Sequence, residues 1–227
     1  GDRTDFAVTP VASSLVLCYI TDRSQFAGDR TTQEARLLEK IAECSAAGVD
    51  YIQLREKDLS GRDLEGLAHR ASSALSRGSK TRLLINSRVD VALACGAHGV
   101  HLPAHNVSAS EVRAVFNQAR TASPIISVAC HSIEDVVQAE SDGADFVVFG
   151  PVFEKAGQPR SEGVQRLSSA CHRKPVHGVA IPVLALGGVA LENAGQCVRA
   201  GAKGTAAIRL FQQNNAFDVV QKLKSTG

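Results

Sequence analysis

A repeated glycine pattern constrains the fold of this chain more than any other feature of the sequence. In four places a glycine follows a helical pattern and precedes a short apolar run, and these glycines are Gly48, Gly96, Gly143 and Gly201. A glycine there is typical of the left-handed residue that ends a helix, and the apolar run is typical of a buried strand. The pattern therefore predicts that helices and strands alternate along the chain.

Eight such alternations are visible in the whole chain. Further apolar runs lie at 15–20, 82–86, 124–129 and 181–186. Helical patterns fall near 31–47, 60–77, 88–95, 108–119, 132–141, 163–172, 190–200 and 214–224. Nearly continuous apolar strands between helices are typical of a parallel sheet buried on both faces. Eight units predict an α/β fold, a single closed (β/α)8 barrel of the TIM type. A doubly wound open sheet is the alternative, but residues 22–28 lack its glycine-rich fingerprint.

We expect one domain over residues 15–227, preceded by an N-terminal extension over residues 1–14. The extension carries charges but lacks the apolar segment of a secretory signal. Hydrophobic residues make up 44% of the chain and charged residues 21%, which is typical of a soluble globular protein with a sizeable core. The apolar runs are far shorter than the ~18 residues of a membrane span, so we expect no membrane partner.

The net charge limits which partners are expected, and the cysteine spacing indicates the redox state of the compartment. The net charge is +2, which leaves no excess to attract nucleic acid. The six cysteines form no CxxC pair, and such spacing fits reduced thiols in a cytoplasm. We therefore expect a cytoplasmic protein without a nucleic-acid partner, and homo-oligomerisation through helix faces stays open.

Polar residues at the end of the second strand mark a candidate site. In (β/α)8 barrels the active site lies at the carboxyl ends of the strands. Gln53 and Arg55 share one face of the second strand, and Lys57 continues it. A buried strand rarely carries Gln and Arg on one face without partners for them. We expect these side chains to point into the barrel mouth and bind substrate.

Small residues after the last two strands predict a phosphate site. Gly187 and Gly188 follow the seventh strand just before a helix, and the eighth strand ends with Gly204, Ala207 and Ile208, again just before a helix. Small residues let backbone N–H groups approach an anion at the start of a helix. Loops after strands seven and eight hold the phosphate in many barrels of this type.

Seven segments in order resemble the thiamine-phosphate synthase/TenI superfamily over residues 17–212. They are YITDR (19–23), QLREK (53–57), LLINSRVDVALACGAHGVHL (83–102), SVACHS (127–132), DFVVFGPVF (145–153), PVLALGG (182–188) and GTAAIRLF (204–211). The family fold is a (β/α)8 barrel. The resemblance implies either of two activities. The synthase joins a hydroxymethylpyrimidine diphosphate to a thiazole phosphate, uses Mg²⁺ and releases pyrophosphate. The TenI-type tautomerase shifts a proton on a carboxythiazole phosphate without a metal.

The chain departs from the synthase pattern where Mg²⁺ binds. Ser87 and Asn106 stand where the synthase carries acidic ligands, and Gln158 stands at the position of a lysine that contacts the diphosphate. Lys155 is a nearby cation that can substitute for it. Mg²⁺ prefers charged oxygen ligands, and a diphosphate leaving group needs its charge neutralised. The departures therefore favour a metal-independent tautomerase, with no cofactor.

The resemblance implies a role for each retained residue. His131 follows the fifth strand, where the TenI-type enzyme places its acid/base histidine, and an imidazole both takes and returns a proton near neutral pH. Arg55 or Lys57 would hold the substrate carboxylate, and Asn86 would orient the ring. The full set of expected substrate-binding residues is Gln53, Arg55, Lys57, Asn86, His101, Ser127 and Lys155. The expected phosphate-binding residues are Gly187, Gly188, Gly204, Ala207 and Ile208.

Two alternatives to the tautomerase stay open. The first is the synthase itself with unusual Mg²⁺ ligation, in which Glu154 or Asp22 supplies a carboxylate. The second is a non-catalytic regulator that binds thiazole or thiamine phosphate. Either way the expected partner is a small phosphorylated thiazole. We also expect an ion pair between Asp22 and Arg23. No metal site is expected from His98, His101 and His105, because a strand followed by a proline loop cannot align them on one helix face.

Overall fold

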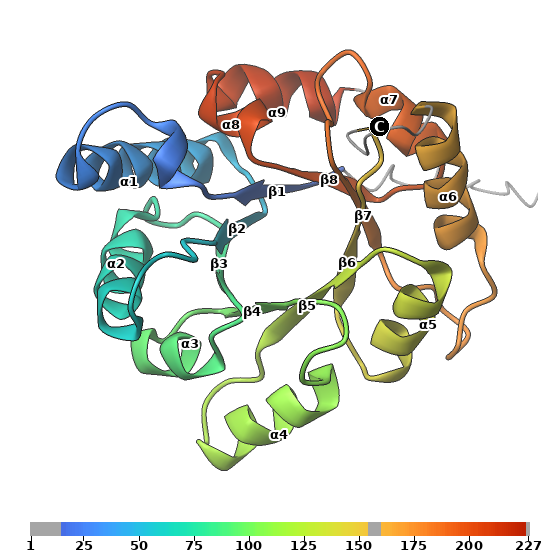
Figure 1. Ribbon diagram of the computed structural model, residues 1–227, viewed down its shortest axis with the longest axis horizontal. Coiled ribbons are helices and arrows are strands. Elements are labelled where there is room, and N and C mark those ends of the chain that lie inside the picture. The colour runs from blue at the N-terminus through green and yellow to red at the C-terminus, as the bar shows by residue number, and fades with distance from the viewer. Residues whose placement is uncertain (1–14, 154–159, 226–227) are drawn as a thin grey trace, which may run out of the picture.

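Eight parallel strands close into a barrel in the computed structural model, which describes residues 15–153 and 160–225 (Figure 1). Each strand pairs with the next one in the sequence, and β8 pairs with β1 to close the sheet. The strands are β1 (Val16–Ile20), β2 (Tyr51–Leu54), β3 (Arg82–Asn86), β4 (Gly99–Leu102), β5 (Ile125–Cys130), β6 (Phe146–Phe149), β7 (Val183–Leu186) and β8 (Gly204–Ala207). The predicted (β/α)8 barrel is therefore confirmed.

Helices form a ring around the strands (Figure 1). They are α1 (Arg30–Ala47), α2 (Gly61–Ala74), α3 (Val89–Cys95), α4 (Ala109–Gln118), α5 (Ile133–Ser141), α6 (Arg160–His172), α7 (Ala194–Arg199), α8 (Arg209–Gln212) and α9 (Ala216–Lys224). A short 3-10 helix, η1 (Arg23–Gln25), follows β1. No helix in the described ranges is both long and apolar enough to cross a membrane. The extension expected over residues 1–14 lies outside the described residues.

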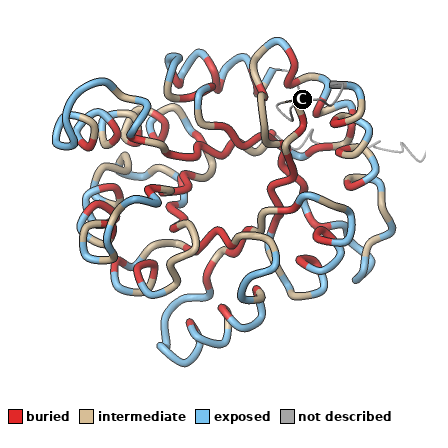
Figure 2. The backbone as a smooth tube through the Cα atoms, viewed as in Figure 1, coloured by how far each residue is buried: buried red, intermediate tan, exposed pale blue. Residues whose placement is uncertain are grey.

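Buried residues form two clusters. Figure 2 colours the backbone red at buried residues, along the strands and on the parts of the helices that face them. The larger layer fills the space between the sheet and the helices. A smaller cluster fills the inside of the barrel and consists of Cys18, Ile20, Leu84, Phe146, Val148, Leu184 and Ala206. Strand side chains alternate between the two layers, and the inward faces of β2, β4 and β5 contribute no residue to this interior cluster.

The glycine repeat corresponds to a repeated hydrogen bond. All four glycines have positive φ, between 64° at Gly96 and 98° at Gly201, and each lies at the end of a helix. In three of the repeats the residue two positions later accepts from the backbone N–H of a neighbouring strand. Asp50 accepts from Leu17, His98 from Leu83 and Asp145 from Ile126, at 2.8, 3.0 and 2.7 Å. In these three repeats the hydrogen bond thus fixes the start of the strand that follows the glycine against its neighbour.

One helix begins later than its sequence pattern predicts. A helix is expected from residue 190, but α7 begins at Ala194. Asn193 accepts a hydrogen bond from the Ala190 N–H at 2.8 Å and donates one to the Gly188 carbonyl at 2.8 Å. These bonds close a turn after the diglycine, because an Asn side chain competes with helical backbone bonds.

Candidate active site

Polar side chains project into the barrel near the carboxyl ends of β3, β4 and β5. Asn86, His101 and Ser127 are register partners on these neighbouring strands. His101 Nδ1 lies 2.8 Å from Ser127 Oγ, and both residues are buried. Burial first, and then the nearby positive charge of Arg55, lowers the pKa of His101 to about 4. His101 is therefore neutral at pH 7 and offers hydrogen bonds rather than charge.

Gln53 of β2 points into the barrel, as the alternation along the strand predicts. Gln53 is buried and pairs in register with Ile20 and Leu84, which both belong to the interior cluster. Arg55 follows at the mouth and is half-buried, whereas Lys57 is exposed. The side chains of Gln53, Arg55, Lys57 and Asn86 make no hydrogen bond or ion pair with another residue of the described part of the chain. Their polar groups are therefore available to a ligand.

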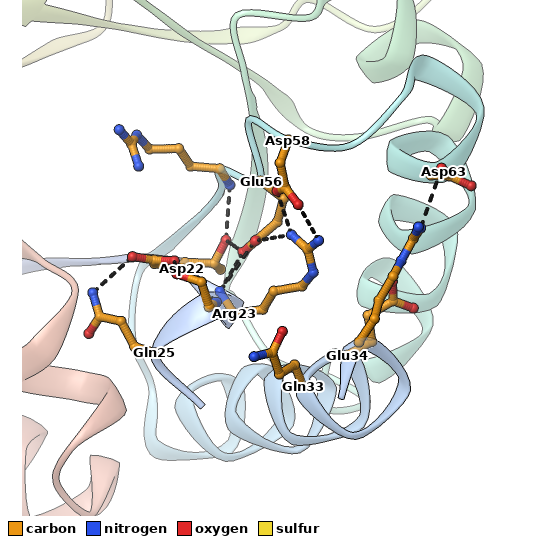
Figure 3. A network of polar contacts seen from close by, with 12 residues as sticks. Asp22, Arg23, Gln25, Gln33, Glu34, Glu56, Asp58 and Asp63 are labelled. Atoms are coloured by element: carbon orange, nitrogen blue, oxygen red, sulfur yellow. Dashed lines mark hydrogen bonds and ion pairs between the residues drawn. The ribbon is translucent and has the colours of Figure 1, made fainter. Parts of the chain in front are cut away.

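A charge network that includes a buried ion pair joins the loops after β1 and β2 (Figure 3). Arg23 pairs with Glu56 at 2.8 Å and with Asp58 at 2.6 Å, and Thr21 donates to Glu56 at 2.8 Å. Burial raises the pKa of Glu56. The expected ion pair between Asp22 and Arg23 is wrong, because Asp22 instead caps η1.

Asp22 accepts hydrogen bonds from the Ser24 hydroxyl and from Gln25 Nε2, at 2.5 and 2.9 Å. Desolvation raises the pKa of Asp22, but these hydrogen bonds and the positive charge of Arg55 outweigh it, and the pKa is lowered overall. The side chain of Arg23 does not pair with Asp22. It extends instead to Glu56 and Asp58 in the loop after β2.

A cavity of about 360 Å³ lies at the carboxyl ends of β7 and β8. It is lined by residues 186–189, by residues 206–210 and by Gln25. Gly187 has φ +100°, and a Cβ on it would lie 2.7 Å from Pro151 Cα. Only glycine fits this position. The predicted phosphate-binding residues Gly187, Gly188, Ala207 and Ile208 all line this cavity.

Gly204 does not belong to this group. It is the first residue of β8, at the amino-terminal end of the strand, and it pairs with Val16. A Cβ on Gly204 would lie 1.9 Å from the Val16 carbonyl oxygen. Gly204 therefore permits close packing of β8 on β1, and its expected place in the phosphate site is wrong.

His131 is exposed, and contacts from three elements hold it. Its backbone N–H donates to Asp135 of α5 at 2.7 Å. Its carbonyl oxygen accepts from Arg166 Nη2 of α6. Its ring atom Nδ1 lies 2.7 Å from the carbonyl oxygen of Gly150, just after β6. The side chain is thus fixed in direction while remaining open to a ligand.

The segment 150–153 connects His131 to the glycine cavity. Gly150 contacts the imidazole, and two residues further along the chain bond to the end of β7. The Val152 N–H donates to the Leu186 carbonyl at 2.8 Å, and the Phe153 N–H donates to the Gly187 carbonyl at 2.9 Å. One short segment therefore fixes the candidate acid/base group relative to the candidate phosphate site.

The residues at the expected Mg²⁺ positions do not fit a Mg²⁺ ion. Ser87 has φ +63°, and its N–H donates to the His101 carbonyl at 2.8 Å. The amide oxygen of Asn106 accepts from the Val107 N–H at 2.7 Å. In the ranges that the structure describes, no three His, Cys, Asp or Glu side chains gather in a way that suits a metal ion. Neutral ligands of this kind are poor partners for a hard dication.

Some predicted residues lie outside the described residues, and some residues at the site were not predicted. Lys155 and Gln158 fall in the segment 154–159 and are not described. Gln25, Asp135 and Arg166 were missed. The Ser132–Asp135 capping box is a local signal that could have found Asp135. No local signal points to Gln25 or Arg166, because each reaches its partners only through the fold.

Fold and site together define a class of protein. It is a (β/α)8-barrel enzyme whose polar groups gather at the carboxyl ends of the strands, the position that active sites of this fold occupy. This chain belongs to the thiamine monophosphate synthase family, which matches residues 17–211.

Individual relatives agree with this assignment. A protein from Geobacter sulfurreducens, provisionally designated a thiamine-phosphate synthase, is 42% identical over 195 residues, which cover 85% of this chain and 84% of the relative. The thiamine-phosphate synthase of Halalkalibacterium halodurans is 34% identical over 81% of this chain and 82% of its own. Among solved structures, the thiamine phosphate pyrophosphorylase of Pyrococcus furiosus superposes with a TM-score of 0.74 at 26% identity, covering 94% of this chain and 96% of its own.

These names bear on the choice between activities. They favour the synthase, expected from the sequence only as an alternative, over the tautomerase, expected from the sequence as the main activity. The preference for the tautomerase is therefore not supported by the relatives.

Proposed function

We propose that this protein is an enzyme of thiamine biosynthesis that binds a thiazole phosphate at the barrel mouth and catalyses the thiamine-phosphate synthase reaction. The observation that carries the proposal is the cavity at Gly187 and Gly188, since both glycines have positive φ and leave backbone N–H groups open to an anion. The names of the relatives support the synthase reaction as the leading activity.

The remaining mouth residues have roles that fit two charged heterocyclic substrates. Arg55 and Lys57 would neutralise the diphosphate of the pyrimidine substrate and the charge that develops on the departing pyrophosphate. Gln53 and Asn86 would orient the rings through amide hydrogen bonds. Neutral His101, paired with Ser127, would contribute a hydrogen-bonding group deeper in the barrel.

A second candidate is the thiazole tautomerase, and two observations favour it. Ser87 and Asn106 replace acids that the synthase uses for Mg²⁺, and the residues present do not fit the metal. His131 is a fixed and exposed imidazole that suits proton transfer at two positions of one substrate. This reaction would move a proton without a diphosphate leaving group, so it would not require the missing charge neutralisation.

One experiment separates the candidates. The purified protein is given the pyrimidine diphosphate and the thiazole phosphate, with Mg²⁺ or with EDTA, and thiamine phosphate is measured. Formation of product supports the synthase, and loss of product in EDTA means that carboxylates other than the expected pair hold the metal. Without product under either condition the synthase is excluded, and the carboxythiazole phosphate tautomers are tested next. Binding without turnover of any substrate would leave the regulator.

A further inference from the structure

We propose that Arg166 is a positioning residue which, together with the Gly150 carbonyl group, holds His131 as its Nδ1–H tautomer and leaves Nε2 as the nitrogen that exchanges a proton with the ligand. The inference rests on the proposed function only in that His131 acts on a bound ligand. The tautomer itself is a property of the protein without ligand and is measured independently of any activity.

The contact at Nδ1 decides the tautomer. His131 Nδ1 and the Gly150 carbonyl oxygen are 2.7 Å apart, and a carbonyl oxygen only accepts hydrogen bonds. Nδ1 must therefore carry the proton in the neutral imidazole. The lone pair is then on Nε2, which is the only ring nitrogen able to act as a base.

This hydrogen bond has a fixed direction only if the backbone of His131 is fixed. Both backbone polar groups of His131, the N–H and the carbonyl, are held by hydrogen bonds. Asp135 accepts from the N–H of His131 at 2.7 Å and from the N–H of Ser132 at 3.0 Å. Arg166 donates from Nη2 to the His131 carbonyl oxygen. With both peptide groups held, only rotation about the side-chain bonds remains, and the Gly150 carbonyl restrains it.

Arg166 is an unusual residue to find at this place. Its guanidinium lies over the ring of Phe149, 5.7 Å from the centroid, and Phe149 is fully buried. Arg166 Nη1 is itself buried, and it has no hydrogen-bond partner within the described residues. An aliphatic side chain would cover Phe149 without burying an unpaired N–H group. What the arginine adds is a charged donor to the carbonyl group of His131.

The surroundings leave room for a ligand beside the ring. A cavity of about 490 Å³ between α5 and α6 is lined by His131, Ile133, Phe149 and Arg166, among others. Segment 150–153, which holds the imidazole, also bonds to Gly187. Arg166 therefore acts on the position of the ring from one side, while the segment 150–153, which bonds to Gly187 of the candidate phosphate cavity, acts from the other.

Nitrogen NMR of the histidine rings tests the tautomer directly. The chain has seven histidines, and His131→Asn identifies the signals of His131. At pH 8.5, about two units above the ordinary imidazole pKa, we expect Nδ1 to give the shift of a protonated nitrogen and Nε2 that of an unprotonated one. In Arg166→Ala we expect the two shifts to converge as both tautomers become populated.

Kinetics then test whether the position matters. With whichever thiazole phosphate substrate is turned over, Arg166→Ala is expected to lower kcat about 10- to 100-fold and to change KM less than about twofold. Arg166→Lys, which keeps the charge and a donor, is expected to recover part of kcat and of the wild-type nitrogen shifts. Arg113→Ala is the matched control, because Arg113 also donates to backbone carbonyls, those of Pro124 and Gly143, but near the amino ends of the strands.

Several outcomes would overturn the inference. An Nε2–H tautomer for His131 in the wild-type protein would exclude it. So would wild-type shifts and kcat in Arg166→Ala, or an equal loss of kcat in Arg113→Ala. If Arg166→Ala does not fold, Arg166→Gln, which keeps an uncharged donor, is measured in its place. If the protein turns over neither substrate, the proposed function fails while the NMR result still decides the tautomer.

Discussion

Arg23 Nη1 lies 2.8 Å from Glu56 Oε2, and the two side chains are only 6% and 2% exposed. This buried ion pair joins the loop after β1 to the loop after β2, where Glu56 follows Arg55 in the sequence. Glu56 also accepts from Thr21, whose hydroxyl in turn accepts from the Arg55 N–H at 2.9 Å. The pair therefore supports the backbone that carries Arg55, a candidate substrate-binding residue.

Removing one partner of this pair is expected to be costly. Arg23→Met leaves the Glu56 carboxylate buried without its counter-charge and should lower the free energy of unfolding by about 3–5 kcal/mol. Arg23→Met combined with Glu56→Gln should recover most of the loss, since no buried charge then lacks a partner. Urea unfolding monitored by circular dichroism measures both. A free energy of unfolding for Arg23→Met within about 1 kcal/mol of the wild-type value would contradict the expectation.

The buried His101 predicts a pH dependence of stability. The folded chain binds a proton on His101 only near pH 4, whereas the unfolded chain binds it near the ordinary value of 6.5. The unfolded state therefore holds more protons between these values, and stability falls as the pH decreases through this window. The full effect, reached below pH 4, is about 3 kcal/mol at 1.36 kcal/mol per unit. It vanishes well above pH 6.5, where His101 is neutral in both states.

Comparison of two variants isolates this effect. Urea unfolding at several pH values between 4 and 7.5 should show that His101→Asn loses the additional dependence. His69→Asn is the control, because it replaces an exposed imidazole on α2. Parallel pH curves for wild type and His101→Asn would show that the proton on His101 is not linked to folding.

Gly187→Ala is expected to damage the phosphate cavity. The new Cβ would lie 2.7 Å from Pro151 Cα and 3.0 Å from the Val152 nitrogen, so the segment 150–153 must shift. We expect binding of thiazole phosphate to weaken about tenfold or more, which corresponds to about 1.4 kcal/mol, measured by calorimetry.

Gly48→Ala provides the matched control for this variant. Gly48 also has positive φ, +87°, but a Cβ added to it would have no other atom within 4 Å, and it is at the end of α1. It should cost about 1–2 kcal/mol of stability and leave binding unchanged. If Gly187→Ala and the wild-type protein bind thiazole phosphate with equal affinity, this cavity is not the phosphate site.

The neutral residues at Ser87 and Asn106 predict a gain of metal dependence. Ser87→Asp together with Asn106→Asp supplies two hard carboxylate ligands. We expect Mg²⁺ to tighten binding of pyrophosphate about tenfold in the double variant and to have no such effect in the wild-type protein. Calorimetry with and without Mg²⁺ measures both. Ser87→Thr with Asn106→Gln is the neutral control, and tighter binding in the wild-type protein would show that other ligands hold the ion.

Local patterns determined the architecture and part of the mouth. The apolar strands and the glycines that end helices repeat within short windows, so eight βα units are visible without a structure. Side-chain alternation along one strand placed Gln53 inside the barrel, and the diglycine after the seventh strand located the cavity. Each of these inferences depends on residues that are neighbours in the sequence, where backbone geometry is nearly fixed.

Other relationships arise only when the barrel closes. Gly204 was assigned to the phosphate site because residues 204–209 were interpreted as the end of the eighth strand, yet its position at the far end follows from its register with Val16. Arg166 reaches a carbonyl group 35 residues away, and Arg23 reaches Glu56 33 residues away. Such contacts depend on how the elements pack. Buried charges and N–H groups need partners, and packing brings those partners together from distant parts of the sequence. The sequence by itself therefore determined the barrel and indicated the end that carries the candidate site, whereas the tertiary structure decided which side chains hold His131, the candidate acid/base group.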